Sequence, residues 1–122
     1  MNLVEKQLAE KIIGACMEVS NELGCGFLEG VCEKALLIAL RDKGLKAEAQ
    51  VPLVVKFRNK AVGEFFADIV VADAVLLELK ATRNIAPEHE AQLLNYLEAS
   101  GHAVGLLVNF GRPKLEWKRF VS

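Results

Sequence analysis

Three charged side chains near the middle of the chain, Asp68, Glu78 and Lys80, are of the types that bind a divalent cation and activate water. Glu78 and Lys80 point to the same face of a strand, because side chains alternate along it. Asp68 lies beside them if the apolar segments 65–72 and 74–81 pair as neighbouring strands. Carboxylate oxygens suit a magnesium-like ion, and a lysine can hold a water molecule or offset developing negative charge. The alternative is a solvated strand end with an incidental salt bridge.

Two expected helices carry further polar pairs that are spaced by one helical turn. Gln92 and Tyr96 lie four residues apart and share a helix face, where they would form a second wall of the same pocket. Glu29 and Glu33 are also one turn apart, and one of them would reach the site of Asp68. The alternatives are a polar flank with a half-buried tyrosine for the first pair and a solvated helix face for the second.

The cysteines, histidines and glycines argue against other kinds of site. Cys16, Cys25 and Cys32 include no CxxC spacing, and Cys32 has no His-Asp arrangement that would make it a nucleophile. His102 has no partner at a metal-ligand spacing. The glycines of segment 24–30 follow a helix rather than a strand, so they do not form a phosphate-binding loop.

The period of the apolar residues changes from helical to extended near residue 46 and returns to helical at Pro87, which suits the first turn of a helix. The predicted helices span residues 3–23, 27–42 and 87–100. The predicted strands span residues 46–57, 61–72, 75–80 and 104–108, with 115–121 as a last strand or a packed tail. The apolar stripe of the second helix is expected at Leu28, Val31, Ala35, Ile38 and Ala39. The order α-α-β-β-β-α-β predicts a layered α/β (α+β) domain in which the first three strands form an antiparallel meander.

Composition is typical of one globular domain and excludes several protein classes. The 122 residues are 52% hydrophobic and 25% charged, which predicts a single domain over residues 1–122 with a real core. A net charge of −1 argues against strong nucleic-acid binding through bulk charge, although a local basic patch remains open. The longest uncharged run is too short to span a membrane. The odd number of cysteines and the absence of a signal-peptide pattern predict a reduced, cytoplasmic protein.

Five sequence blocks, taken together, are similar to the motifs of one known family. In chain order they are Gly26-Phe-Leu-Glu29-Gly-Val-Cys32, Phe66-Ala-Asp68, Leu77-Glu78-Leu-Lys80-Ala, His89-Glu-Ala-Gln92-Leu-Leu-Asn-Tyr96-Leu and Gly105-Leu-Leu-Val-Asn-Phe-Gly111. In combination they resemble the bacterial GxxExxY proteins, which are grouped with the PD-(D/E)xK nuclease-like superfamily. The resemblance implies a restriction-endonuclease-like core, with a central mixed sheet flanked by helices.

The resemblance also implies a metal-dependent nuclease that hydrolyses phosphodiester bonds, with Mg²⁺ or Mn²⁺ as the cofactor. Asp68 and Glu78 would be the metal ligands. Lys80 would orient the attacking water and offset charge on the phosphorane. The implied partner is nucleic acid, with DNA favoured over RNA and no membrane, and a homo-oligomer is left open.

The remaining matched positions would support the same site. Glu29 would assist at the metal from its helix, and Gln92 and Tyr96 would support the site or contact the substrate. One position departs from the pattern, because the family tyrosine of GxxExxY is Cys32 in this chain. A second interpretation is therefore a catalytically inactive nuclease-fold module that serves in binding or assembly. Magnesium or manganese binding, followed by a cleavage assay, would distinguish the two.

Overall fold

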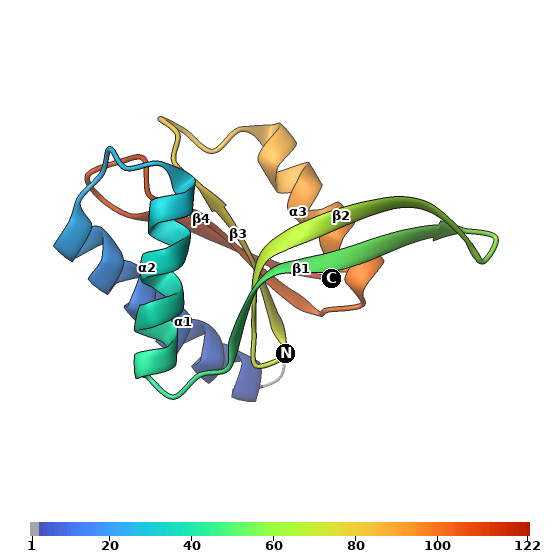
Figure 1. The fold of residues 1–122 in the computed structure, drawn as a ribbon, viewed down its shortest axis with the longest axis horizontal. Coiled ribbons are helices and arrows are strands. Elements are labelled where there is room, and N and C mark those ends of the chain that lie inside the picture. The colour runs from blue at the N-terminus through green and yellow to red at the C-terminus, as the bar shows by residue number, and fades with distance from the viewer. Residues whose placement is uncertain (1–2) are drawn as a thin grey trace.

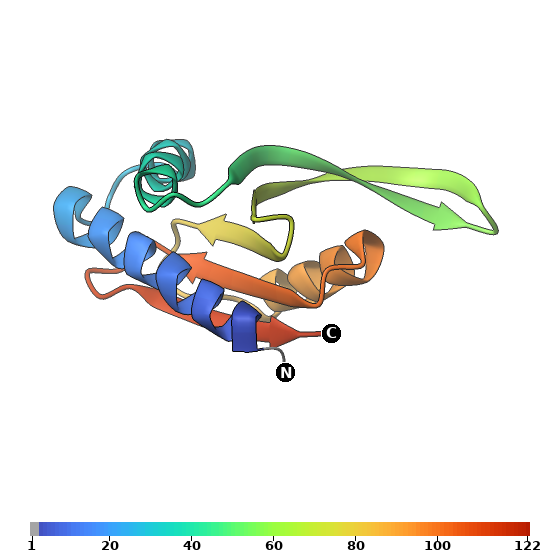
Figure 2. The same ribbon diagram turned by 90° about the horizontal axis from the view of Figure 1, so that it is seen from below.

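The computed structural model of the chain describes residues 3–122, which form a five-stranded sheet with helices on both faces (Figures 1 and 2). The elements are α1 (Leu3–Leu23), α2 (Glu29–Asp42), β1 (Ala47–Phe57), β2 (Lys60–Val71), β3 (Val75–Lys80), α3 (Pro87–Ser100), β4 (Val104–Asn109) and β5 (Glu116–Val121). The strands lie in chain order, and every neighbouring pair is antiparallel except β3 and β4, which are parallel. The predicted layered fold with a mixed sheet is confirmed, and the C-terminal segment is a strand rather than a tail. No helix in this described part of the chain is long and apolar enough to cross a membrane.

Two clusters of buried side chains lie on the two faces of the sheet. One contains residues of α1 and α2 together with Leu77 and Leu79 of β3. The other contains residues of α3 together with Leu76. Because side chains alternate along β3, this assignment places Glu78 and Lys80 on the α3 face.

The parallel pairing of β3 and β4 requires a crossover, and α3 supplies it. The helix begins at Pro87, as predicted, and the backbone N–H of Ala86 donates to Nδ1 of His89 at 3.0 Å. It ends at Ser100, and the capping residue Gly101 has a φ of 75°, the left-handed conformation that favours glycine. Both ends of α3 are therefore defined by local sequence.

The buried face of α2 differs from the predicted one. Its buried residues are Cys32, Leu36 and Leu40. Leu28 and Ile38, by contrast, are 80% and 63% exposed. The helix has apolar residues on two faces, so periodicity alone does not decide which of them meets the sheet. The stripe prediction was therefore wrong for Leu28, Val31 and Ile38.

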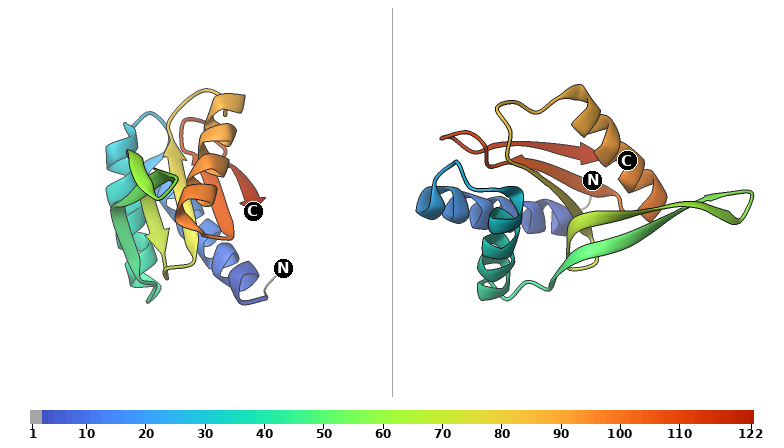
Figure 3. Two further views of the ribbon diagram at one scale, coloured as in Figure 1. Left: turned by 90° about the vertical axis from the view of Figure 1, so that its right-hand side faces the viewer. Right: turned by 45° about the horizontal axis from the view of Figure 1, so that its top comes forward.

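Strands β1 and β2 continue past the rest of the sheet as a projecting two-stranded arm, residues 52–66 (Figures 1 and 3). Its tip is the turn between Phe57 and Lys60, where Arg58 and Asn59 have φ values of 50° and 64°. Ladder pairing in the arm shifts register between Val55 and Lys56.

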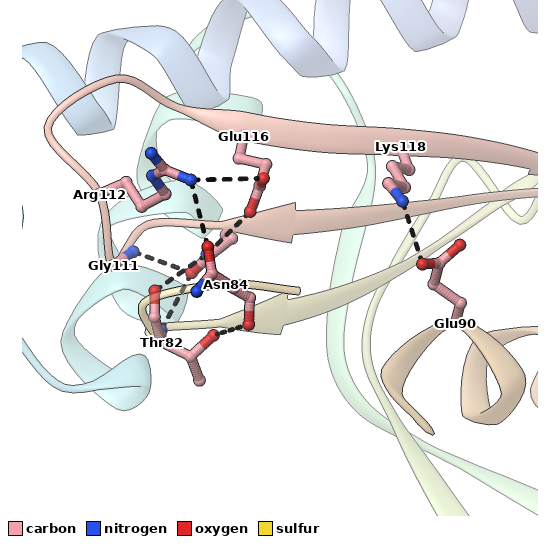
Figure 4. A network of polar contacts seen from close by, with 8 residues as sticks. Thr82, Asn84, Glu90, Gly111, Arg112, Glu116 and Lys118 are labelled. Atoms are coloured by element: carbon pink, nitrogen blue, oxygen red, sulfur yellow. Dashed lines mark hydrogen bonds and ion pairs between the residues drawn. The ribbon is translucent and has the colours of Figure 1, made fainter. Parts of the chain in front are cut away.

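The segment after β3 is fastened to the segment after β4 by the buried side chain of Asn109. Its Oδ1 accepts from the backbone N–H groups of Thr82 at 3.0 Å and Gly111 at 2.9 Å, and its Nδ2 donates to the carbonyl of Thr82 at 2.9 Å. Nδ2 also donates to Glu116 at 3.2 Å. Figure 4 shows Thr82, Gly111 and Glu116 gathered in this network. A Cβ at Gly111 would collide with the backbone of Thr82, so this close approach requires glycine. The network holds the chain directly after Lys80.

Replacing Asn109 with alanine is expected to lower the free energy of unfolding by about 1–3 kcal/mol, because the backbone N–H and carbonyl of the partly buried Thr82 lose their partner. Urea unfolding measures the change. Asn84→Ala is the matched control, since the Asn84 amide accepts only an exposed hydrogen bond from Arg112 at 3.3 Å. Equal losses in the two variants would contradict a structural role for Asn109.

Candidate metal centre

Asp68 and Glu78 lie side by side where β2 and β3 part. Ile69 and Leu77 form the last pair of the β2–β3 ladder, so Asp68 and Glu78 are the next residue on each strand. Each carboxylate then bonds to the backbone of the opposite strand. Oε1 of Glu78 accepts from the N–H of Asp68 at 3.3 Å, and Oδ2 of Asp68 accepts from the N–H of Leu79 at 2.7 Å. Beyond the last ladder pair, hydrogen bonds from backbone N–H groups to the two carboxylates thus connect the strands and hold both side chains in position. The two side chains lie beside each other, as expected if these strands pair.

Asp68 also has no ladder partner on its other neighbouring strand, β1, because the backbone of β1 is irregular at Gln50. The ladder pairs Ala49 with Ile69 and Val51 with Ala67, which leaves Gln50 and Asp68 as the unpaired positions between them. Gln50 has a φ of 52°, a left-handed conformation that is strained for a residue with a side chain. Its side chain hydrogen-bonds to Asp68, and its Nε2 donates to Glu33 at 3.0 Å.

Gln50 is the residue of this site that sequence analysis missed. It lies in an extended run whose only other feature is Pro52, so neither its spacing nor its type distinguished it. Glu33 was predicted as a solvated or site-reaching residue of α2, and the structure places it against Gln50.

The carboxyl group of Glu78 is the most perturbed acid of the site. Only 4% of the residue is exposed. Burial first, and then the charge of Asp68, raise the pKa of Glu78 to about 8. An interaction between the side chains of Glu78 and Asp68 adds a smaller contribution that raises the pKa of Glu78 in the same direction. Burial also raises the pKa of Asp68, although the N–H of Leu79 opposes this by stabilising the carboxylate.

Lys80 and Glu29 act on this pair with opposite signs. The partly buried Lys80 lowers the pKa of both carboxyl groups through its positive charge. Glu29, which is exposed at the first turn of α2, raises the pKa of Asp68 through its negative charge. The structure therefore brings both predicted residues within electrostatic reach of the carboxylates.

The helix α3 presents Gln92 and Tyr96 to the same face. Nε2 of Gln92 donates to the hydroxyl of Tyr96 at 3.1 Å, which confirms that they share a helix face. Tyr96 is buried, and burial first, followed by the charges of Glu78 and Asp68, raises its pKa. The hydroxyl of Tyr96 thus lies within electrostatic reach of both carboxylates.

Cys32, the position that departs from the GxxExxY pattern, is a buried core residue of α2. Burial first, and then the charge of Glu29, raise the pKa of its thiol. A protonated, buried thiol is a poor nucleophile. The side chain therefore packs rather than reacts.

The donor set of Asp68 and Glu78 fits a hard divalent cation. Within residues 3–122 no group of three or more histidine, cysteine, aspartate and glutamate side chains could hold a metal ion, so this pair would be the protein's contribution. Mg²⁺ is commonly held by one or two carboxylates, with waters and substrate phosphate oxygens as the other ligands. A cation at this pair would offset the repulsion between the two carboxylates, which raises the pKa of Glu78.

Two open grooves border the site. The larger, of about 1110 Å³, lies between the arm and α3, and Phe65, Gln92 and Tyr96 are among its lining residues. The other, of about 610 Å³, is lined by Glu29 and by residues 81–83, which directly follow Lys80. Residues predicted for the site, Gln92 and Tyr96 in the first groove and Glu29 in the second, therefore line both grooves.

Comparisons with known proteins agree with this architecture. The family model described as PD-(D/E)XK nuclease superfamily matches residues 6–120. No curated protein matches the chain. The crystal structure of SSO0001 has the same fold, with a TM-score of 0.60 at 18% sequence identity. The match covers 77% of this chain and 50% of that one, so the chain spans half the length of that protein. The restriction-endonuclease-like core implied by the sequence is confirmed.

Proposed function

The chain belongs to the PD-(D/E)XK nuclease superfamily, and from this premise we propose that it is a divalent-metal-dependent nuclease that hydrolyses phosphodiester bonds. The observation that carries the proposal is the pair Asp68 and Glu78, held by crossed hydrogen bonds where β2 and β3 part, with Lys80 beside it. Within the superfamily we assign the chain to the GxxExxY group, on the sequence blocks given above. We further infer DNA rather than RNA as the substrate, one domain over residues 1–122 and a cytoplasmic location.

In this proposal each side chain has a defined task. Asp68 and Glu78 would hold Mg²⁺ or Mn²⁺, which when bound polarises the phosphate and makes water a better nucleophile. The ammonium of Lys80 donates hydrogen bonds to the attacking water and offsets the negative charge that develops on the phosphoryl oxygens. Gln92 holds the hydroxyl of Tyr96 in place, so that this wall of the site is fixed before substrate arrives.

The direct test is a cleavage assay with single- and double-stranded DNA and RNA in the presence of Mg²⁺ or Mn²⁺. We expect cleavage by the wild-type protein and a rate lower by about a hundredfold or more for Glu78→Gln and Asp68→Asn, because a catalytic metal supplies several kcal/mol of transition-state stabilisation. Glu22→Gln, an equal change at an exposed position of α1, is expected to cleave like the wild type.

One result would replace this proposal with the inactive binding or assembly module. It is the absence of cleavage of all four substrates by folded wild-type protein with either metal. Equal rates for wild type and Glu78→Gln would instead point to a contaminating nuclease.

A further inference from the structure

The tip of the arm carries a concentration of unpaired positive charge. Segment 49–63 contains no acidic residue and three basic ones, Lys56, Arg58 and Lys60. All three are exposed, and in the described part of the chain no carboxylate pairs with any of them. Arg58 instead stacks its guanidinium over the ring of Phe57, 4.9 Å from the ring centre. A protein with a net charge of −1 therefore has a local cationic surface at the end of the arm. Figure 3 shows how this hairpin projects.

A groove leads from this arm back toward the carboxylates. Lys56 and Phe65 line it on the arm side, and Gln92, Asn95 and Tyr96 line it on the α3 side. Phe65 and Tyr96 meet across it, with ring centres 5.6 Å apart and ring planes tilted by 39°. Tyr96 lines the groove and also lies within electrostatic reach of Glu78 and Asp68, so the groove passes near the candidate metal centre.

We propose that this groove is a binding site for a single strand of nucleic acid, with phosphates on the cations of the arm and bases against the Phe65–Tyr96 ring pair. The site rests on the proposed function, because the strand it holds would be delivered to the carboxylates. Cationic grooves that contain aromatic side chains bind single strands, whose bases are free to stack on the rings. A duplex keeps its bases inside its own stack, so it would meet the arm's cations and not the rings.

The charges along the two walls of the groove indicate which wall the phosphates of the nucleic acid contact and which wall its bases contact. Glu88 and Glu98 lie on the α3 side of the groove and repel phosphates, whereas Lys56 lies on the arm side. The sugar–phosphate backbone therefore follows the arm. The base edges face α3, where the carboxylates of Glu88 and Glu98 accept from amino groups and Asn95 offers both a donor and an acceptor.

The test measures binding of a short fluorescent oligonucleotide by anisotropy, with EDTA present so that no cleavage occurs. The triple variant Lys56→Gln, Arg58→Gln, Lys60→Gln is expected to bind the single strand about tenfold more weakly or worse, and to lower the slope of log affinity against log salt by about 2. The matched control is Lys11→Gln, Lys34→Gln, Lys114→Gln, which removes the same charge from exposed positions outside the arm. The control should keep both the affinity and the slope.

The ring pair is tested separately with Phe65→Leu, which keeps an apolar side chain but removes the flat face. We expect weaker binding of the single strand and little change for a duplex of the same sequence. Far-ultraviolet circular dichroism and the melting temperature show that the variants are folded.

Several outcomes would overturn the site. One is equal affinity of the arm variant and its control for the oligonucleotide, and another is tighter binding of duplex than of single strand. A third is self-association in light scattering that depends on the arm, without any change in oligonucleotide affinity, which would make a second copy of the chain the occupant. Binding without metal separates this proposal from the nuclease. If the protein binds the oligonucleotide through the arm but does not cleave nucleic acid, the result supports the groove and contradicts the proposed function. If it cleaves nucleic acid and the arm variant changes neither cleavage nor binding, the result supports the proposed function and contradicts the groove.

Discussion

Replacing Lys80 with methionine is expected to lower the rate of nucleic-acid cleavage by about a hundredfold or more while leaving a metal-binding site intact. Methionine keeps most of the apolar stem but removes the charge and all three donors. The loss falls on the transition state, where negative charge develops, rather than on the ground state. Single-turnover cleavage rates measure the effect, and a rise in melting temperature with Mn²⁺ reports the metal.

The comparison must be made at saturating Mn²⁺, because the charge of Lys80 lowers the pKa of both Asp68 and Glu78. Without that charge the carboxyl groups hold their protons more tightly, and the metal competes less well at a given pH. Lys114→Met, at an exposed position after β4, is the control for loss of a lysine charge. A Lys80→Met protein that cleaves at the wild-type rate with saturating metal would show that Lys80 only tunes the carboxylates.

The positions of Asp68 and Glu78 were predictable because the relevant physics is local. Both residues lie in apolar runs joined by a tight turn at Asp73, so alternation and hairpin register together fix the face on which each side chain lies. The spacing of Gln92 and Tyr96 is equally local, since an α-helix dictates which side chains share a face. These features required no knowledge of the rest of the fold.

The features that sequence analysis missed depend on distant contacts. Gln50 becomes part of the site only because β1 kinks opposite Asp68, and no residue type in that run demands a left-handed conformation. The buried face of α2 depends on how α1 and the sheet meet it, and both of its faces are apolar enough to be buried. Asn109 directly follows the predicted strand 104–108, in a segment predicted only as a loop, and its polar role appears only where the chain after β3 passes beside it.

Without metal, the protein is expected to lose stability as the pH rises from about 4.5 to about 8. Glu78 has an ordinary pKa of 4.5, and burial beside Asp68 raises it to about 8 in the folded protein. Over that interval the folded state keeps a proton that the unfolded state releases, so stability is fully present below the lower value and falls toward the higher one. A single group of this kind contributes a slope of at most about 1.4 kcal/mol per pH unit. The raised pKa of Asp68 acts in the same direction.

Mn²⁺ is expected to reverse this trend, because it binds the deprotonated carboxylates and stabilises only the folded state. The stabilisation by metal should therefore grow across the same pH interval in which the stability of the protein without metal declines. Urea unfolding at several pH values, with Mn²⁺ or with EDTA, measures both curves. Glu78→Gln removes the titrating group while keeping the size of the side chain, so it should flatten the EDTA curve and abolish most of the gain from Mn²⁺. If the variant retained the wild-type pH dependence and the wild-type response to Mn²⁺, Glu78 would be neither the titrating group nor a metal ligand.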